Sequence, residues 1–250
     1  MSKIKKKLRV FAGPNGSGKT TLFEEFSKKF NTGHFINADI IENTLKTKGF
    51  INLDQFNLKV SSNDFDIFLE TSNAKSLLKK AKDENQSIKL SLVENFIIGN
   101  YSENYGYKGS LISSFLREQL MRNDQSYSFE TVMSHISKLE EIQEAKNQGY
   151  ATYFYFICTD DPEVNIARVE NRVKKGGHNV TTSKINERYE KTLVNLFSAI
   201  NICDKSFIFD NSNEKLVLIA EIQSGQNLTV NVDEKYLPNW FNNYVLKYFI

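Results

Sequence analysis

Hydrophobic positions along the chain alternate between two patterns. Short segments that read as strands fall at residues 8–12, 35–39, 127–131, 151–158 and 206–209, and 151–158 is almost entirely aromatic or aliphatic. Apolar residues at helical spacing fill 20–30 and 135–148, and Gly149 ends the second of these segments. Strands that alternate with helices predict an α/β fold with a largely parallel sheet.

A long segment interrupts this alternation. Residues 43–124 are mostly polar, with helical spacing clearest at 74–83. The segment is too long for a simple crossover between two strands. We therefore expect one domain over residues 1–250 that carries an inserted helical subdomain at 43–124.

The last part of the chain, 213–250, predicts a C-terminal extension. Residues 215–223 and 228–232 flank a Ser-Gly-Gln turn, which is typical of a hairpin. Residues 239–250 follow an apolar helical pattern. Their aromatic cluster at 240–244 could dock a partner, but packing onto the domain is the preferred interpretation.

Composition narrows the class of protein. The 250 residues are 40% hydrophobic and 25% charged, which excludes a mainly disordered chain. The net charge of +2 argues against a protein dominated by nucleic-acid binding, so nucleic acid is not expected as a partner. The basic residues at 3–7 are interpreted as a solvated arm.

The cysteine count and the hydropathy of the sequence indicate the cellular compartment in which the protein is expected. Two cysteines, Cys158 and Cys203, are too few for a disulfide framework or a four-cysteine zinc site, and they fit a reducing compartment. No apolar run approaches the roughly 18 residues of a membrane span. We expect a cytoplasmic protein without a membrane partner.

The segment GPNGSGKT at 13–20 carries the strongest chemical signal, because it matches the Walker A pattern G-x-x-x-x-G-K-[ST] in full. Glycines let successive N–H groups point at phosphate oxygens, and the next helix adds a partial positive charge. Lys19 would reach the β- and γ-phosphates, and the Thr20 hydroxyl would bind Mg²⁺. The expected nucleotide-binding residues are Gly13, Pro14, Asn15, Gly16, Ser17, Gly18, Lys19, Thr20 and Thr21.

This loop leaves the reaction open, because ATPases, GTPases and small-molecule kinases share it. The sequence has no Asn-Lys-x-Asp motif for guanine and no run of four aliphatic residues ending in Asp-Glu. Asp39 follows at the end of the second expected strand. It could accept the proton of an attacking hydroxyl, or it could cap the helix that follows.

Several motifs, in this order, resemble the zeta-toxin-like P-loop kinase family: GPNGSGKT at 13–20, INAD at 36–39, FETVMS at 129–134, RVENRVKKGGH at 168–178, RY at 188–189 and FDNS at 209–212. The similarity covers residues 8–42 and 112–212. Well-understood members phosphorylate a hydroxyl of UDP-N-acetylglucosamine and are toxins paired with a small antitoxin. The resemblance implies a doubly wound α/β/α kinase fold, ATP and Mg²⁺, a small-molecule hydroxyl substrate and an antitoxin partner.

The resemblance also implies roles for single residues. Asp39 matches the general base, and Glu130 and Thr131 match the position that binds the substrate. Glu130 could instead orient Mg²⁺ through water, or it could be a strand-end carboxylate held by neighbouring N–H groups. Asp39 is counted with both the catalytic and the substrate-binding residues.

Arginines surround the Gly-Gly pair at 176–177. We expect Arg172 and Arg188 to be catalytic and Arg168 to bind the nucleotide, since a mobile arginine lid can neutralise the γ-phosphate. The alternative is a solvated helix face whose arginines pair with Glu170 and Glu187. His178 is interpreted as structural, and Thr181 replaces a proline that is common in relatives.

Four functional hypotheses follow. The first is an ATP-dependent kinase of a small hydroxyl substrate, and the second adds a toxin role. The third is a module that binds or slowly hydrolyses ATP without an acceptor. The fourth is a kinase of polynucleotide 5′-hydroxyl groups, whose binding would depend steeply on salt. The segment 43–124 is expected to shape the acceptor pocket.

Overall fold

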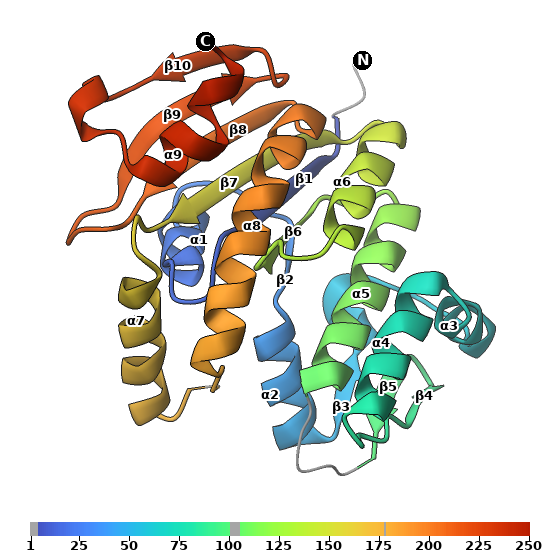
Figure 1. The fold of residues 1–250 in the computed structure, drawn as a ribbon. Coiled ribbons are helices and arrows are strands. Elements are labelled where there is room, and N and C mark those ends of the chain that lie inside the picture. The colour runs from blue at the N-terminus through green and yellow to red at the C-terminus, as the bar shows by residue number, and fades with distance from the viewer. Residues whose placement is uncertain (1–4, 101–105, 178) are drawn as a thin grey trace. The chain divides into compact units, whose positions relative to one another are not determined.

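The computed structural model describes residues 5–100, 106–177 and 179–250, and the chain divides into two compact units (Figure 1). Unit 1 comprises Met1–Thr32 and Ser128–Ile250, and unit 2 comprises Gly33–Tyr127. The segment 43–124, expected as an inserted subdomain, lies within unit 2. The two units are described separately below.

The strands of unit 1 lie in the order β10-β9-β8-β7-β1-β6. β7 pairs in parallel with both β1 and β8, whereas β9 pairs antiparallel with β8 and β10. The parallel strands therefore end at one edge of the sheet, where loops of α/β proteins commonly bind ligands. Their bounds are β1 (Lys7–Ala12), β6 (Tyr127–Thr131), β7 (Ala151–Cys158), β8 (Lys205–Asp210), β9 (Val217–Gln223) and β10 (Asn227–Val230).

Helices cover both faces of this sheet (Figure 1). On one face Phe11 and Tyr155 pack against Phe26 of α1, at ring distances of 5.7 and 5.0 Å. On the other face Phe156 packs against Trp240 of α9. This is the predicted doubly wound arrangement. The helices are α1 (Lys19–Ser27), α6 (Ser137–Asn147), α7 (Pro162–Lys174), α8 (Thr182–Ile202) and α9 (Asn239–Tyr244).

The C-terminal extension contains the expected hairpin and helix, but the helix is shorter than expected. The expected hairpin is formed by β9 and β10, and Trp240 and Phe241 are buried, as the packing interpretation requires. The expected helix over 239–250 is too long. Buried Val245 leaves the helical region at φ −128°, and only a 3₁₀ turn, η3 (Leu246–Tyr248), follows.

Unit 2 contains the expected helices and also a sheet that the helical expectation missed. Its strands are β2 (His34–Ile36), β3 (Phe50–Asn52), β4 (Leu90–Val93) and β5 (Phe96–Gly99). The last three form an antiparallel sheet in the order β3-β5-β4. The helices are α2 (Ala38–Lys48), the 3₁₀ turn η1 (Leu53–Phe56), α3 (Ser62–Leu69), α4 (Ser72–Asp83) and α5 (Gly106–Arg122).

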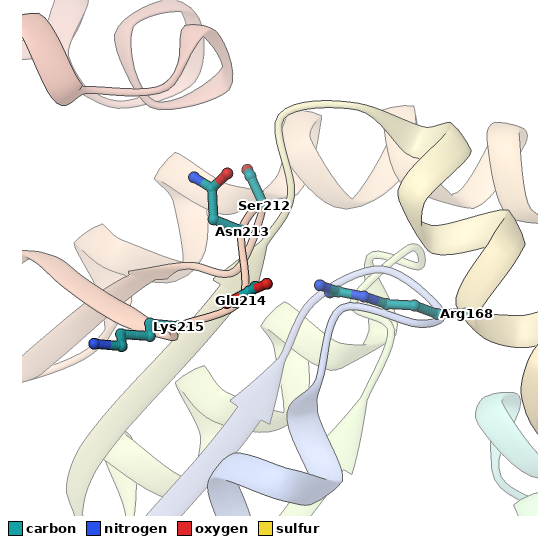
Figure 2. A pocket seen from close by; sticks show the side chains of 5 residues that line it. All are labelled: Arg168, Ser212, Asn213, Glu214 and Lys215. Atoms are coloured by element: carbon teal, nitrogen blue, oxygen red, sulfur yellow. The ribbon is translucent and has the colours of Figure 1, made fainter.

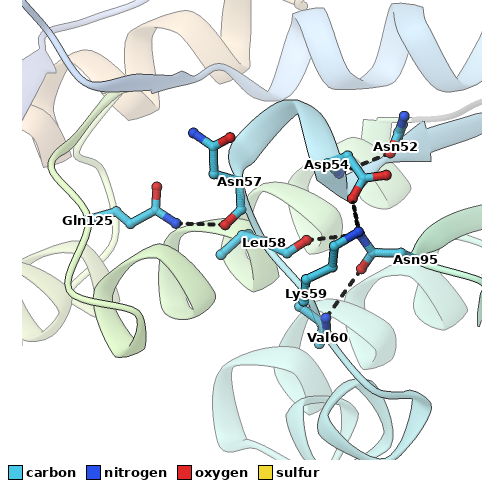
Figure 3. Close-up of polar contacts among 8 residues, drawn as sticks. All are labelled: Asn52, Asp54, Asn57, Leu58, Lys59, Val60, Asn95 and Gln125. Atoms are coloured by element: carbon cyan, nitrogen blue, oxygen red, sulfur yellow. Dashed lines mark hydrogen bonds and ion pairs between the residues drawn. The ribbon is translucent and has the colours of Figure 1, made fainter.

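Asn95, in the turn between β4 and β5, joins three parts of unit 2 (Figure 3). Its amide nitrogen donates to Asp54 Oδ1 and to the Leu58 carbonyl, both at 2.8 Å, and its oxygen accepts from the Val60 N–H at 3.2 Å. Its own carbonyl accepts from the Leu53 N–H. The turn therefore depends on one side chain that has both a donor and an acceptor.

Replacing Asn95 by alanine is expected to destabilise unit 2 by about 2–3 kcal/mol, because Asp54, Leu58 and Val60 lose a partner. Asn85→Ala is a matched control: Asn85 also has a positive φ, 56° against 67°, but its exposed side chain lies outside this network. The control should cost about 1 kcal/mol. Hydrogen exchange of the amides of β3, β4 and β5 measures the loss of stability in each variant. Equal losses in Asn95→Ala and Asn85→Ala would contradict the role of Asn95.

Candidate functional site

The Walker A residues form the predicted loop between β1 and α1. Gly16 and Gly18 have φ values of 78° and 103°, which favour glycine. Both also lack room for a side chain. A Cβ on Gly16 would lie 2.5 Å from the Asn165 carbonyl oxygen, and one on Gly18 would lie 2.5 Å from Asn211 Nδ2. The loop is thus held closely by α7 and by the segment after β8.

Gly16→Ala is expected to weaken nucleotide binding at least tenfold, since the new Cβ must displace the backbone of Asn165. Gly149→Ala is its control, because Gly149 has a similar φ of 85° and nothing within 4 Å of the added Cβ. Both variants carry the left-handed backbone cost, and only the first has the clash. Calorimetric titration with Mg-ATP would test this, and equal affinities of the two variants would refute it.

Lys19 is buried in this loop, with 7% of its surface exposed. Its ammonium donates to the carbonyl oxygens of Gly13 and Pro14, at 2.9 and 2.8 Å. Gly18 caps α1 and has no side chain that could satisfy the first N–H groups of the helix. The loop therefore brings a lysine charge and a helix N-terminus together, an arrangement that favours a bound anion.

Glu130, at the end of β6, is paired with the loop. The Thr20 hydroxyl donates to Glu130 Oε2 at 2.9 Å, and the Gly13 N–H donates to the carbonyl of Thr131 at 3.3 Å. This contact brings Glu130 to the loop, and its three interpretations stay predictions. The hydrogen bond between the Gly13 N–H and the Thr131 carbonyl holds the start of the loop.

A hydroxyl and a carboxylate fit a magnesium site of the kinase type. The described part of the chain contains no group of three or more His, Cys, Asp or Glu side chains arranged to hold a metal. Mg²⁺ does not need such a cage, because it keeps several waters and takes one or two protein oxygens together with substrate phosphates. Thr20 and Glu130 could supply those oxygens.

Four of the buried polar atoms that lack a hydrogen-bond partner belong to the loop or to helix α7, which packs against it. They are the fully buried Ser17 Oγ and Asn165 Nδ2, together with Asn15 Oδ1 and Arg168 Nη1. Most buried polar groups in proteins are paired, so a cluster of unpaired ones points to a ligand. This signal could not be obtained from the sequence, because Asn165 belongs to none of the recognised motifs.

An open pocket of about 720 Å³ is lined by Arg168 of α7 and by residues 212–215 after β8 (Figure 2). Figure 2 shows the Arg168 side chain reaching toward Glu214. Ser212 of the pocket directly follows Asn211, whose Nδ2 donates to the Ser17 carbonyl of the phosphate loop at 2.8 Å. Arg168 was expected to bind the nucleotide, and its role stays a prediction. Residues 213–215 belong to none of the sequence motifs, although the motif at 209–212 ends directly before them.

The other predicted arginines lie outside this pocket. Arg172 is exposed near the end of α7, and its carbonyl accepts from the Gly177 N–H at 3.0 Å. Arg188 is half-buried on α8, and its neighbour Glu187 pairs with Lys191. The catalytic roles of Arg172 and Arg188 stay predictions. His178 lies outside the described residues.

Asp39 belongs to unit 2, in the first turn of α2. The interpretation of Asp39 as the helix cap is wrong, because Asn37 fills that position. Asn37 Oδ1 accepts from the N–H groups of Asp39 and Ile40, at 2.9 and 3.2 Å. The strand also ends earlier than expected, at Ile36. The Asp39 carboxylate is exposed, and its role as a base stays a prediction.

Neither cysteine adds nucleophilic chemistry to the site. Cys158 and Cys203 are both buried and free. Burial raises the pKa of the Cys158 thiol, and it raises the pKa of Cys203 to about 12. Both thiols are therefore protonated at neutral pH.

Among the helices of the described residues, none has the length and apolarity that a membrane crossing requires.

No family model matches the chain. An uncharacterized protein of Haemophilus influenzae is 30% identical over 63 residues, which are 25% of this chain and 45% of that protein. The chain thus matches less than half the length of this relative.

Solved structures are similar over more of the chain. A chain in crystals of AvrRxo1-ORF1:AvrRxo1-ORF2 has a TM-score of 0.56 at 12% identity, over 93% of this chain and 62% of its own length. The crystal of that complex with ATP also gives 0.56, at 13% identity. A chain of the PezAT toxin-antitoxin system of Streptococcus pneumoniae has a TM-score of 0.48 at 15% identity. The similarity covers 87% of this chain and 72% of that chain. The α/β fold of this chain is thus similar to that of the chain in the AvrRxo1-ORF1:AvrRxo1-ORF2 crystals.

Proposed function

We propose that the protein transfers the terminal phosphate of ATP to a hydroxyl group of a small molecule. The observation that carries this proposal is the glycine-rich loop of unit 1. It presents a buried lysine, a helix N-terminus and a Thr20–Glu130 pair at one place. These are the parts that phosphoryl transfer needs, since its catalysis consists mostly of positioning and charge stabilisation.

Different groups of the loop bind the phosphates and the metal ion. N–H groups of the loop and of the first turn of α1 bind phosphate oxygens, and Lys19 exchanges its two carbonyl partners for oxygens of the β- and γ-phosphates. Thr20 and Glu130 would hold Mg²⁺, which, when bound, neutralises charge that develops between those phosphates. The pocket beside Arg168 receives the nucleoside. The choice of ATP over GTP rests on the motif resemblance.

Transfer itself requires an acceptor and a base. Asp39 takes the hydroxyl proton while the acceptor oxygen forms a bond to the γ-phosphorus, and the bond to the β-phosphate oxygen breaks to release ADP. Arg172 and Arg188 stabilise the charge on the transferred group, and Thr131 contacts the acceptor. These assignments, like a UDP-N-acetyl sugar as acceptor and an antitoxin as protein partner, rest on the motif resemblance.

ADP release from Mg-ATP, with and without UDP-N-acetylglucosamine, tests the proposal. Stimulation by the sugar nucleotide, with a phosphorylated product detected by mass spectrometry, would support the kinase and its acceptor. Tight ATP binding without stimulation would direct the search to another acceptor. Slow hydrolysis that no hydroxyl compound changes would favour the binding module, and absence of ATP binding in calorimetry would refute the proposal.

A further inference from the structure

The C-terminal helix α9 contacts two carboxylates at the end of the parallel strands. Asp210 ends β8, and Asp160 follows β7, its parallel neighbour. The backbone N–H of Trp240 donates to Asp160 Oδ1 at 3.2 Å, and Asn239 Nδ2 donates to Oδ2 of the same residue at 3.0 Å. The indole Nε1 of Trp240 donates to Asp210 Oδ1 at 3.3 Å. Helix α9 therefore donates hydrogen bonds to both carboxylates.

Asp210 in turn shapes the segment that follows it. Its carboxylate accepts from the Ser212 hydroxyl at 2.7 Å and from the Ser212 N–H at 3.2 Å. The Ser212 hydroxyl also accepts from the Asp160 N–H at 2.8 Å, which ties the two strand ends together. The turn at 210–212 is thus closed by side-chain hydrogen bonds that depend on the orientation of Asp210.

This turn holds the phosphate loop. The Asn211 N–H donates to the Cys158 carbonyl, and Asn211 Nδ2 donates to the Ser17 carbonyl, both at 2.8 Å. Asn211 lies so close to Gly18 that a Cβ there would clash with its amide. Ser212 lines the pocket beside Arg168. A shift of Asp210 would therefore move a wall of the pocket and a contact of the loop together.

We infer that Trp240 is a positioning residue for the nucleotide site, acting through Asp210 and the turn at 210–212. The inference rests on the proposed function, because it assumes that the phosphate loop binds a nucleotide. Trp240 is 3% exposed and packs on Phe156 and Phe241, with ring distances of 5.7 and 6.0 Å. Phenylalanine in its place would keep most of this packing and would lose the donor to Asp210.

The test compares Trp240→Phe with Phe241→Leu, a neighbour on the same helix that is fully buried. Trp240→Phe is expected to raise the Kd for Mg-ATP and Mg-ADP about five- to tenfold, with kcat at saturating nucleotide nearly unchanged. Phe241→Leu should lower the Tm at least as much and leave both Kd values within twofold. A Kd that follows the Tm in both variants would overturn the inference.

Two further measurements separate this inference from the proposed function. If Trp240 acts through Asp210, Trp240→Phe adds little to the Kd change of Asp210→Asn in the double variant, whereas additive effects would contradict the pathway. Hydrogen exchange of residues 13–18 in the nucleotide-free protein should speed up in Trp240→Phe. Unchanged exchange overturns the inference, and a wild-type protein that binds no nucleotide overturns the proposed function even if exchange changes.

Discussion

Replacing Lys19 by methionine is expected to lower phosphate transfer at saturating Mg-ATP by about a thousandfold. The ammonium of Lys19 lies within the loop, where two backbone carbonyls hold it. Methionine keeps the apolar stem, so the loop can pack in nearly the same way, but it lacks the charge that we propose meets the γ-phosphate. Single-turnover transfer with the wild-type protein and the variant gives the ratio directly.

Lys28→Met is the matched control for this variant. Lys28 directly follows α1, and its side chain is 65% exposed and paired with Glu25 at 2.6 Å. An exposed pair of this kind contributes little to stability, and its loss should leave transfer within twofold of wild type. Circular dichroism would check that Lys19→Met is folded. A folded Lys19 variant with more than a tenth of wild-type transfer would contradict the assignment.

The parts of the fold that the sequence predicted well are those whose signal is local. β6 and β7 match the expected segments residue for residue. For β7 the signal is a nearly continuous run of aromatic and aliphatic residues, which is typical of a strand buried on both faces. The glycine-rich loop between β1 and α1 was equally predictable, since the motif places its glycines and its lysine at fixed spacing. In both cases, neighbours along the chain carry enough information to define the structure.

The parts that were missed depend on contacts far apart in the chain. β3, β4 and β5 are three or four residues long, and the turn of Asn95 is stabilised by residues 35 to 41 positions away. The role of Glu130 stayed open for the same reason, because its partner Thr20 lies 110 positions away. Composition and periodicity cannot reveal which of two distant polar residues will meet.

Asp39 illustrates a different limit. Its position after an apolar run extended the expected strand by three residues, when the chain had already turned at Asn37. Asparagine is as good a helix cap as aspartate, and the pattern contained both. Because Asn37 makes the cap, Asp39 keeps an exposed carboxylate that no helix-capping bond occupies. A substitution of Asp39 therefore leaves the cap of α2 in place, so it can test the role of Asp39 as a base separately from helix stability.

Replacing Asp39 by asparagine is expected to leave the Kd for Mg-ATP within threefold and to lower transfer to the acceptor by about a thousandfold. Asparagine has the same shape but accepts no proton at neutral pH. The helix should persist, since Asn37 still caps it and only about 0.3–1 kcal/mol of interaction with the helix N-terminus is lost. Calorimetry and single-turnover transfer measure the two quantities separately.

Asp66→Asn is the control for Asp39→Asn, because Asp66 is an exposed aspartate on α3 of the same unit. It should change neither binding nor transfer by more than twofold. If Asp39→Asn transferred as fast as wild type, the base would have to be another group and the proposed chemistry of unit 2 would be wrong. If binding and transfer fell together with the helix content, Asp39 would be a structural residue. Only loss of transfer with intact binding and intact helix identifies a base.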